Sequence, residues 1–136
     1  MPRTAHANLF AGTPVYMIHN VKHMSLLAAQ PALGEFEQLV LLALLRLGPE
    51  AYGASLRREI ESRTGRALSI SAVYVTLDRL EDKGLVRSRI GEPTPERGGR
   101  RKKHYALLPS GRRAVARAYR TFKVMVDGLE GQLGPV

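Results

Sequence analysis

The 136-residue sequence contains no cysteine and no tryptophan. The absence of cysteine excludes disulfides, thiolate metal sites and cysteine nucleophiles, and it fits a reducing cytoplasm. The longest apolar run covers residues 39–45, well short of the ~20 residues that a membrane-spanning helix needs. The N-terminus also lacks a charged segment followed by an unbroken apolar one, so no signal peptide is expected. We therefore expect a cytoplasmic protein without membrane attachment.

Residue patterns typical of enzymes and metal sites are missing as well. No nucleophile–base pair is recognisable, and Gly98-Gly99 lacks the Lys-Ser/Thr of a phosphate-binding loop. His19 and His23 have the i, i+4 spacing of two metal ligands on a helix, but no third ligand lies nearby. We therefore expect no catalytic residues, no metal and no cofactor.

The net charge of +9 is unevenly distributed along the chain. Residues 31–90 hold nine basic and eight acidic side chains, whereas 91–104 and 105–136 each hold five basic and two acidic ones. A localised excess of cations indicates contact with a polyanion, although a solvated basic loop gives the same pattern.

Three helices are predicted in the first two thirds of the chain. The first, 33–47, is apolar nearly all round and is expected to be buried in the core or against a partner. The second, 51–64, ends at Gly65. A short connection then leads to the third helix, which we expect between an N-cap at Ser71 and a stop at Gly84. Two helices joined in this way are typical of a helix-turn-helix.

The third helix has two contrasting faces. Val73, Leu77 and Leu80 recur at i, i+4 and i+7 and are expected to be buried. The opposite face carries Ser71, Val75, Asp78, Arg79 and Asp82. Serine, valine and arginine exposed on a helix can read base edges in a major groove. An ordinary amphipathic helix shows the same pattern, so this helix alone does not decide between the two interpretations.

After Gly84 the apolar period changes from 3.6 to 2, which predicts strands over 85–90 and 103–108. The loop between them, 91–102, has two prolines, three glycines and four basic residues. A hairpin with a basic loop directly after a helix-turn-helix is a wing, whose cations can contact phosphates or enter a minor groove. The candidate wing cations are Arg97, Arg100, Arg101, Lys102 and Lys103.

The last predicted helix begins around Pro109-Ser110-Gly111, with Ser110 as the expected N-cap. Its apolar residues follow the spacing 4, 3, 4, 3, 4, which is the seam of a helix that packs along another helix. The seam consists of Val115, Tyr119, Phe122, Val126, Leu129 and Leu133. Packing on the core of the same domain would give a similar pattern, but we favour a dimer interface.

These elements predict a mainly α fold with a small β-hairpin wing. We expect a poorly ordered N-terminal arm over 1–30, a winged helix-turn-helix DNA-binding domain over 31–109 and a C-terminal dimerisation helix over 110–136.

With these elements in order, the chain resembles the PadR family of bacterial transcriptional regulators. The matching segments are LGEFEQLVLLALLRL (33–47), AYGASLRREI (51–60), ISAVYVTLDRLEDKGLV (70–86) and GRRKKHYALLPSGRRAV (99–115). The resemblance implies a winged helix-turn-helix homodimer that exchanges its C-terminal helix and usually represses transcription. The family's recognition-helix pattern maps onto Ser71, Tyr74, Leu77, Arg79, Leu80, Glu81 and Gly84, and its wing pattern onto Gly99, Arg100, Lys102, Lys103 and Tyr105.

The leading hypothesis is a regulator that binds double-stranded DNA at a pseudo-palindromic operator, with its recognition helices about 34 Å apart. Ser71, Ala72, Val75 and Arg79 are then expected to face bases, while Tyr74 contacts a phosphate or packs at the edge of the core. The alternative is a winged-helix protein–protein interaction module without sequence-specific DNA binding. A small-molecule effector of unknown identity is a further possible partner, with Tyr52, Tyr119 or Phe122 as candidate contacts.

Overall fold

The computed structural model describes residues 32–92 and 101–135. The chain divides into two units, 1–32 and 33–136, and the helices and strands described below belong to the second. The predicted arm over 1–30, the candidate metal ligands His19 and His23, and the wing residues Arg97 and Arg100 lie outside the described residues.

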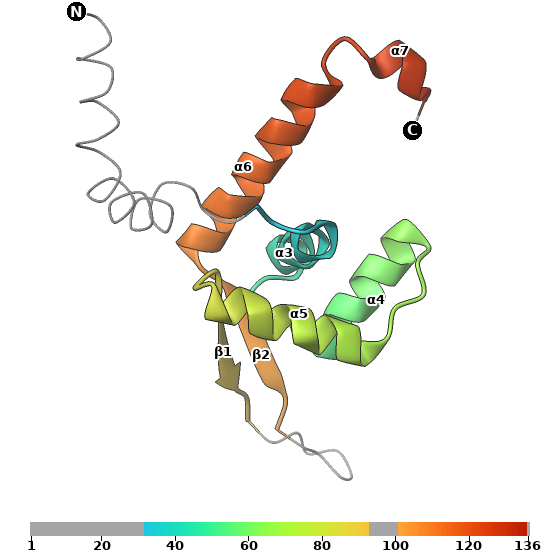
Figure 1. Cartoon of the computed structure of the whole chain (residues 1–136). Coiled ribbons are helices and arrows are strands. Elements are labelled where there is room, and N and C mark those ends of the chain that lie inside the picture. Colours follow the sequence, from blue (N-terminus) through green and yellow to red (C-terminus); the bar gives the residue numbers. More distant parts are fainter. Residues whose placement is uncertain (1–31, 93–100, 136) are drawn as a thin grey trace, which may run out of the picture. The chain divides into compact units, whose positions relative to one another are not determined.

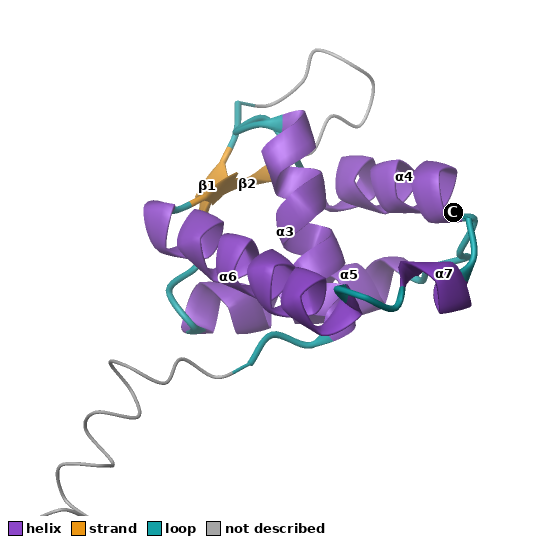
Figure 2. Ribbon diagram, turned by 90° about the horizontal axis from the view of Figure 1, so that it is seen from above, coloured by secondary structure: helices purple, strands orange, loops and turns teal. Residues whose placement is uncertain are grey.

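Helix α3 (Glu35–Leu47) lies at the centre of the described unit, between α4 and α6 (Figures 1 and 2). It contacts α4, α5, α6 and strand β2. Its buried apolar residues are Val40, Leu41, Ala43 and Leu44. The nearly continuous apolar sequence of this helix is therefore explained by contacts on several sides, although Leu42 remains 44% exposed.

Helices α4 (Gly53–Thr64) and α5 (Ile70–Asp82) form the helix-turn-helix. Gly65 ends α4 in the left-handed region, at φ 74°, as its position predicts. The N-cap of α5 is Ser69 and not Ser71, because it is the Ser69 hydroxyl that accepts the Ala72 N–H, at 3.1 Å. Ser71 is already helical, so its hydroxyl cannot cap the helix from outside.

The predicted division of α5 into two faces is confirmed. Val73, Leu77 and Leu80 are fully buried against the rest of the core. After Asp82 the chain reverses at Gly84, whose φ of 73° is accessible to glycine at low cost.

Strands β1 (Val86–Ile90) and β2 (Lys103–Leu107) form the predicted antiparallel hairpin, and Val86 pairs with Leu107. The sequence did not predict that a third segment of the chain pairs with this wing near its loop end. Tyr52 forms an isolated bridge with His104. The Tyr105 N–H donates to the Ala51 carbonyl at 2.8 Å. The segment immediately before α4 is thus joined to the wing.

Helix α6 (Pro109–Val126) is followed by a short helix α7 (Glu130–Leu133). Ser110 lies inside α6 and is not its N-cap, since Leu108 occupies that position and the Ser110 hydroxyl donates to the Gly84 carbonyl at 2.6 Å. Gly111 is buried, and a Cβ atom there would collide with the backbone carbonyl of Leu85.

The predicted single C-terminal helix is wrong beyond Val126. Asp127 leaves the helical conformation and Gly128 has a φ of 86°. The chain turns there because glycine reaches the left-handed region easily, and Leu129 and Leu133 consequently do not continue the face of α6. The fold remains the mainly helical winged helix that the sequence predicts. None of the described helices has the length and apolar character needed to cross a membrane.

Candidate nucleic-acid interface

The N-terminal half of α5 presents an uncharged, solvent-exposed surface. Ser71 and Ala72 are exposed, and Val75 is 49% exposed. Its C-terminal half is acidic, because Asp78, Glu81 and Asp82 accompany a single arginine. The unpaired N–H groups of a helix N-terminus favour an anion, so the first half of α5 is the half suited to approach a nucleic acid.

Arg79 lies in the last turn of α5 and is exposed. Its charge helps to lower the pKa of Glu37, near the start of α3. Arg79 is therefore separated along the helix from Ser71 and Ala72, with which the sequence pattern grouped it.

Tyr74 packs at the edge of the core, which is one of its two predicted roles, while its contact with a phosphate stays a prediction. Its side chain is 39% exposed, and its ring lies against Gly53, the first residue of α4, where a Cβ atom would overlap the ring. Gly53 thus makes room for the aromatic ring between α4 and α5, while part of Tyr74 remains open to solvent.

Glu37 and Lys83 connect the start of α3 to the residue that follows α5. The Lys83 Nζ atom lies 2.9 Å from Oε1 and 2.7 Å from Oε2 of Glu37, and the Gly34 N–H also donates to Oε1, at 2.8 Å. Glu37 is 8% exposed. Burial opposes its ionisation, but the bonds from Lys83 and Gly34 outweigh burial and hold its pKa below the ordinary value. This ion pair fixes the C-terminal end of α5 against α3.

A second carboxylate connects α5 to the wing. Oε2 of Glu81 accepts the Ser88 hydroxyl at 2.7 Å and the Ser88 N–H at 3.2 Å. Because Ser88 is the middle residue of β1, the orientation of the wing depends on α5.

The described cations of the predicted wing lie at the loop end of the hairpin and are exposed. They are Arg101, Lys102 and Lys103. The Lys103 Nζ lies 5.7 Å from the centre of the Tyr105 ring, and the Lys102 Nζ lies 4.2 Å from the centre of the Tyr52 ring. The hairpin projects from the domain below α5, as Figure 1 shows.

Sequence reasoning missed the surroundings of Tyr52. Its hydroxyl accepts a hydrogen bond from Arg58 Nη2 at 2.9 Å, and its ring meets His104 edge-on, with 6.0 Å between ring centres. The hydrogen bond from Arg58, with the charges of Arg58 and Lys102, lowers the pKa of Tyr52. The sequence does place Arg58 outside its helix, but it gives no sign that a wing lysine lies nearby.

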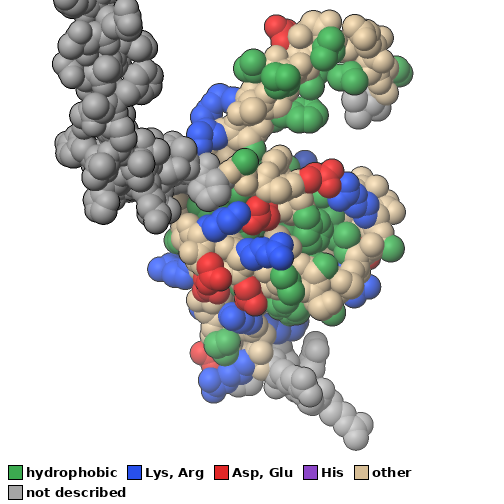
Figure 3. Space-filling model, viewed as in Figure 1, with side chains coloured by type: hydrophobic (Ala, Val, Ile, Leu, Met, Phe, Trp, Pro, Cys, Tyr) green, Lys and Arg blue, Asp and Glu red, His purple; other side chains and the backbone are tan. Residues whose placement is uncertain are grey.

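The residues of the predicted dimer seam differ in exposure: the first is buried, and most of the later ones are exposed. Val115 is only 5% exposed and belongs to the core of its own domain, so the structure does not leave it free for a partner. Farther along α6, Tyr119 is 61% and Phe122 68% exposed, and Val126 is half-buried. Beyond the turn, Leu129 and Leu133 are also exposed. Figure 3 shows hydrophobic side chains gathered along α6 where it extends from the rest of the domain.

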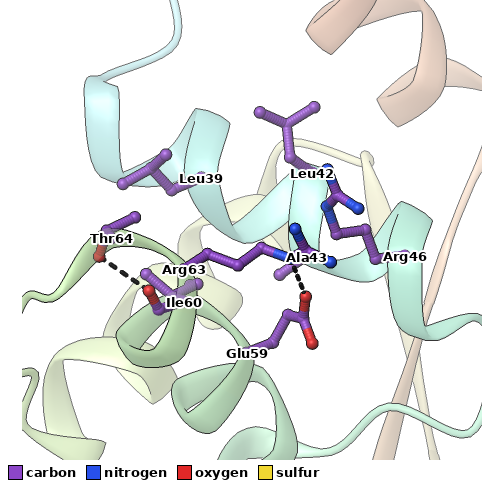
Figure 4. A pocket seen from close by; sticks show the side chains of 8 residues that line it. All are labelled: Leu39, Leu42, Ala43, Arg46, Glu59, Ile60, Arg63 and Thr64. Atoms are coloured by element: carbon purple, nitrogen blue, oxygen red, sulfur yellow. Dashed lines mark hydrogen bonds and ion pairs between the residues drawn. The ribbon is translucent and has the colours of Figure 1, made fainter. Parts of the chain in front are cut away.

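A pocket of about 170 Å³ lies between α3 and α4 (Figure 4). Its lining residues are Leu39, Leu42, Ala43, Arg46, Glu59, Ile60, Arg63 and Thr64. Arg63 pairs with Glu59 on the same helix, four residues away. None of the three aromatic residues considered for an effector site lines this pocket. Among the residues that the structure describes, no group of three side chains is arranged to hold a metal.

A comparison with known protein families agrees with the fold described above. The sequence model of the Transcriptional regulator PadR-like family matches residues 41–117, more than half of the chain. No curated protein matches the chain.

Three solved structures share the fold. A PadR family transcription regulator from Clostridium difficile R20291 has a TM-score of 0.62 and 23% identity, over 74% of this chain and 100% of that one. The PadR-like transcriptional regulator BC4206 from Bacillus cereus has a TM-score of 0.59 and 16% identity, over 74% and 93%. The complex structure hsRosR-S4, of RosR from h. salinarum, has a TM-score of 0.56 and 26% identity, over 72% and 77%.

Proposed function

The chain belongs to the PadR-like family of transcriptional regulators, and we propose that it represses transcription by binding a pseudo-palindromic operator as a homodimer. The observation that carries the proposal is the exposed, uncharged N-terminal half of α5 on a domain whose wing is basic toward its loop. Bound at a promoter, such a dimer would exclude the transcription machinery.

In this proposal α5 and the wing contact different parts of the DNA. Ser71, Ala72 and Val75 contact base edges in the major groove, where a hydroxyl can bond several bases and an apolar side chain can meet a thymine methyl. Arg79 contacts a base at the edge of the same site, and Tyr74 contacts a phosphate. The wing cations bind the backbone, which supplies affinity and register without reading sequence. They are Arg97, Arg100, Arg101, Lys102 and Lys103.

The exposed stripe on α6 supports the homodimer. Tyr119 and Phe122 are more than half exposed on a helix whose first turns are buried in the domain core. Large apolar side chains exposed together mark a protein interface, and a two-fold axis would pair the stripe with its own copy. The dimer then presents two α5 helices about 34 Å apart, one turn of DNA.

DNA binding is tested by fluorescence anisotropy with the duplex upstream of the protein's own gene and a scrambled duplex, across a salt series. We expect preference for the upstream duplex, loss of that preference in Arg79→Ala, and a smaller salt dependence when Arg100, Arg101, Lys102 and Lys103 are all replaced by alanine. Absence of binding at low salt would refute the proposal in favour of the interaction module, which needs no DNA.

The dimer is tested by sedimentation of Phe122→Glu, with Thr121→Glu as the matched control. Thr121 is exposed and lies about 100° around the axis of α6 from Phe122, so its variant adds the same charge outside the stripe. We expect wild type and Thr121→Glu to sediment as dimers and Phe122→Glu as a monomer. Equal dimerisation of all three proteins would place the interface elsewhere. A small-molecule effector stays a prediction, for which the pocket between α3 and α4 offers space.

A further inference from the structure

Two cations from distant parts of the sequence converge on the Tyr52 side chain. Arg58, on α4, donates to the Tyr52 hydroxyl at 2.9 Å. Lys102, directly before β2, holds its Nζ atom 4.2 Å from the centre of the ring. Tyr52 itself is held in place by its backbone bridge to His104 and by the edge-on contact of the two rings. The cluster therefore has a fixed aromatic centre that one cation from α4 and one from directly before β2 both contact.

Within the part of the chain that the structure describes, neither of these two cations has a carboxylate partner. Five other cations of the domain do have one. These pairs are Arg57–Glu61, Arg63–Glu59, Arg66–Glu35, Lys83–Glu37 and Arg89–Glu50. Arg58 and Lys102 instead share a neutral phenol, which leaves their positive charges uncompensated.

An anion with several oxygens would complete this arrangement. A guanidinium presents several donors in a fixed fork that matches phosphate, and an ammonium binds phosphate as a point charge. Because the Tyr52 oxygen already accepts from Arg58, its hydroxyl hydrogen remains available to donate to a phosphate oxygen. The cluster thus offers donors of three kinds around one position.

We propose that Arg58, Tyr52 and Lys102 form a clamp for one phosphate of the DNA backbone, and that this clamp joins α4 to the loop end of the wing. The inference rests on the proposed function, since it assigns the phosphate to duplex DNA. Arg58, Lys102 and the Tyr52 hydroxyl bind the phosphate, and the Tyr52 ring positions both cations. A phosphate held in this way orients the duplex relative to α4 and the wing together, without reading sequence.

The test measures anisotropy against salt for wild type, Arg58→Ala, Lys102→Ala and the double variant, on both duplexes. Neutralising one phosphate contributes about 0.9 to the slope of log K against log salt. If both cations bind one phosphate, the double variant lowers the slope by about 0.9 in total, and not by about 1.8 as for two independent phosphates. Each single variant should bind DNA several-fold more weakly than wild type. The sum of these two losses in binding free energy should exceed the loss in the double variant.

Arg57→Ala is the matched control, because it removes the same charge one residue away, from a side chain that pairs with Glu61. We expect its slope to equal that of wild type. Tyr52→Phe keeps the ring but removes the hydroxyl, so we expect an intermediate loss of affinity that is equal for both duplexes. Thermal melting by circular dichroism verifies that each variant folds, and Arg58→Lys, which retains the charge, should restore most of the slope.

The possible results distinguish failure of the phosphate clamp from failure of the proposed operator binding. The clamp is refuted, while operator binding stands, if Arg58→Ala has the same DNA affinity and salt slope as Arg57→Ala. It is also refuted if the losses of binding free energy in Arg58→Ala and Lys102→Ala add up to the loss in the double variant. If wild type shows no preference between duplexes but the coupled slope change persists, operator recognition fails and the clamp holds as a nonspecific contact. Absence of any binding refutes both.

Discussion

Replacing Glu37 by glutamine tests how α5 is held against α3. The neutral amide retains an oxygen for the Gly34 N–H, but it loses the charge that attracts Lys83 at 2.7 and 2.9 Å. The side chains of Glu37 and Lys83 are 11% and 30% exposed, so neither cation nor carboxylate is fully hydrated in the folded protein. Glu37→Gln therefore leaves a partly buried ammonium without its counter-ion.

The expected loss of stability is about 2 kcal/mol, within the range for hydrogen bonds to charged groups. It is smaller than the 3–5 kcal/mol typical of a broken, fully buried pair, because water can reach the Lys83 ammonium after the change. For a domain of this size such a loss lowers Tm by about 10 °C. Glu50→Gln is the control, since Glu50 pairs with Arg89 at the surface, where ion pairs contribute little.

The assay is urea unfolding followed by circular dichroism at one protein concentration, from pH 7 downward. The folded-state pKa of Glu37 lies below its ordinary value of 4.5, so protons bind the unfolded state first. The stability that Glu37 contributes is therefore complete above pH 4.5 and is lost as the pH falls through the folded-state pKa. The difference between wild type and Glu37→Gln should narrow in the same range.

A result in which Glu37→Gln is as stable as Glu50→Gln at pH 7 would refute this reasoning. So would a difference that persists unchanged well below pH 4.5, since an electrostatic contribution must disappear when the carboxylate is protonated. A double-mutant cycle with Lys83→Met isolates the pairwise part, which should account for most of the loss.

Three further predictions follow from single residues. Gly111→Ala should destabilise the domain by about 1–3 kcal/mol, because the added methyl meets a rigid backbone carbonyl; Gly131→Ala, in open space, should not lower the unfolding midpoint. Asp78→Asn should raise DNA affinity a few-fold, because it removes a negative charge from the exposed face of α5. Its control is Glu130→Gln, on α7, which should leave the DNA affinity measured by anisotropy unchanged. Burial, with nearby acidic groups, raises the pKa of Tyr105 to about 12. Stability should therefore fall as the pH rises from 10 toward 12, and denaturant unfolding of Tyr105→Phe should lack that part of the fall.

The sequence alone predicts the helices, the hairpin and the buried face of α5, because apolar periodicity follows directly from helix and strand geometry. It predicts helix ends less well. Serine at 69, 71 and 110 has the same capping chemistry, and only the backbone conformation decides that Ser69 caps α5 while Ser110 bonds to the Gly84 carbonyl. The single apolar seam that the spacing predicts over 115–133 is interrupted after Val126, because the chain turns at Gly128.

What the sequence determined is thus the local structure and the types of residue on each surface: the mainly helical winged fold, the basic wing and the apolar C-terminal stripe. What only the tertiary structure decided is which distant residues meet. Val115 lies in the core because α6 first packs on the domain before leaving it. Arg58 and Lys102 meet at Tyr52 because the segment before α4 pairs with β2. Periodicity acts over a few residues, whereas these contacts depend on how separate elements pack, and that packing brings together side chains far apart in the chain.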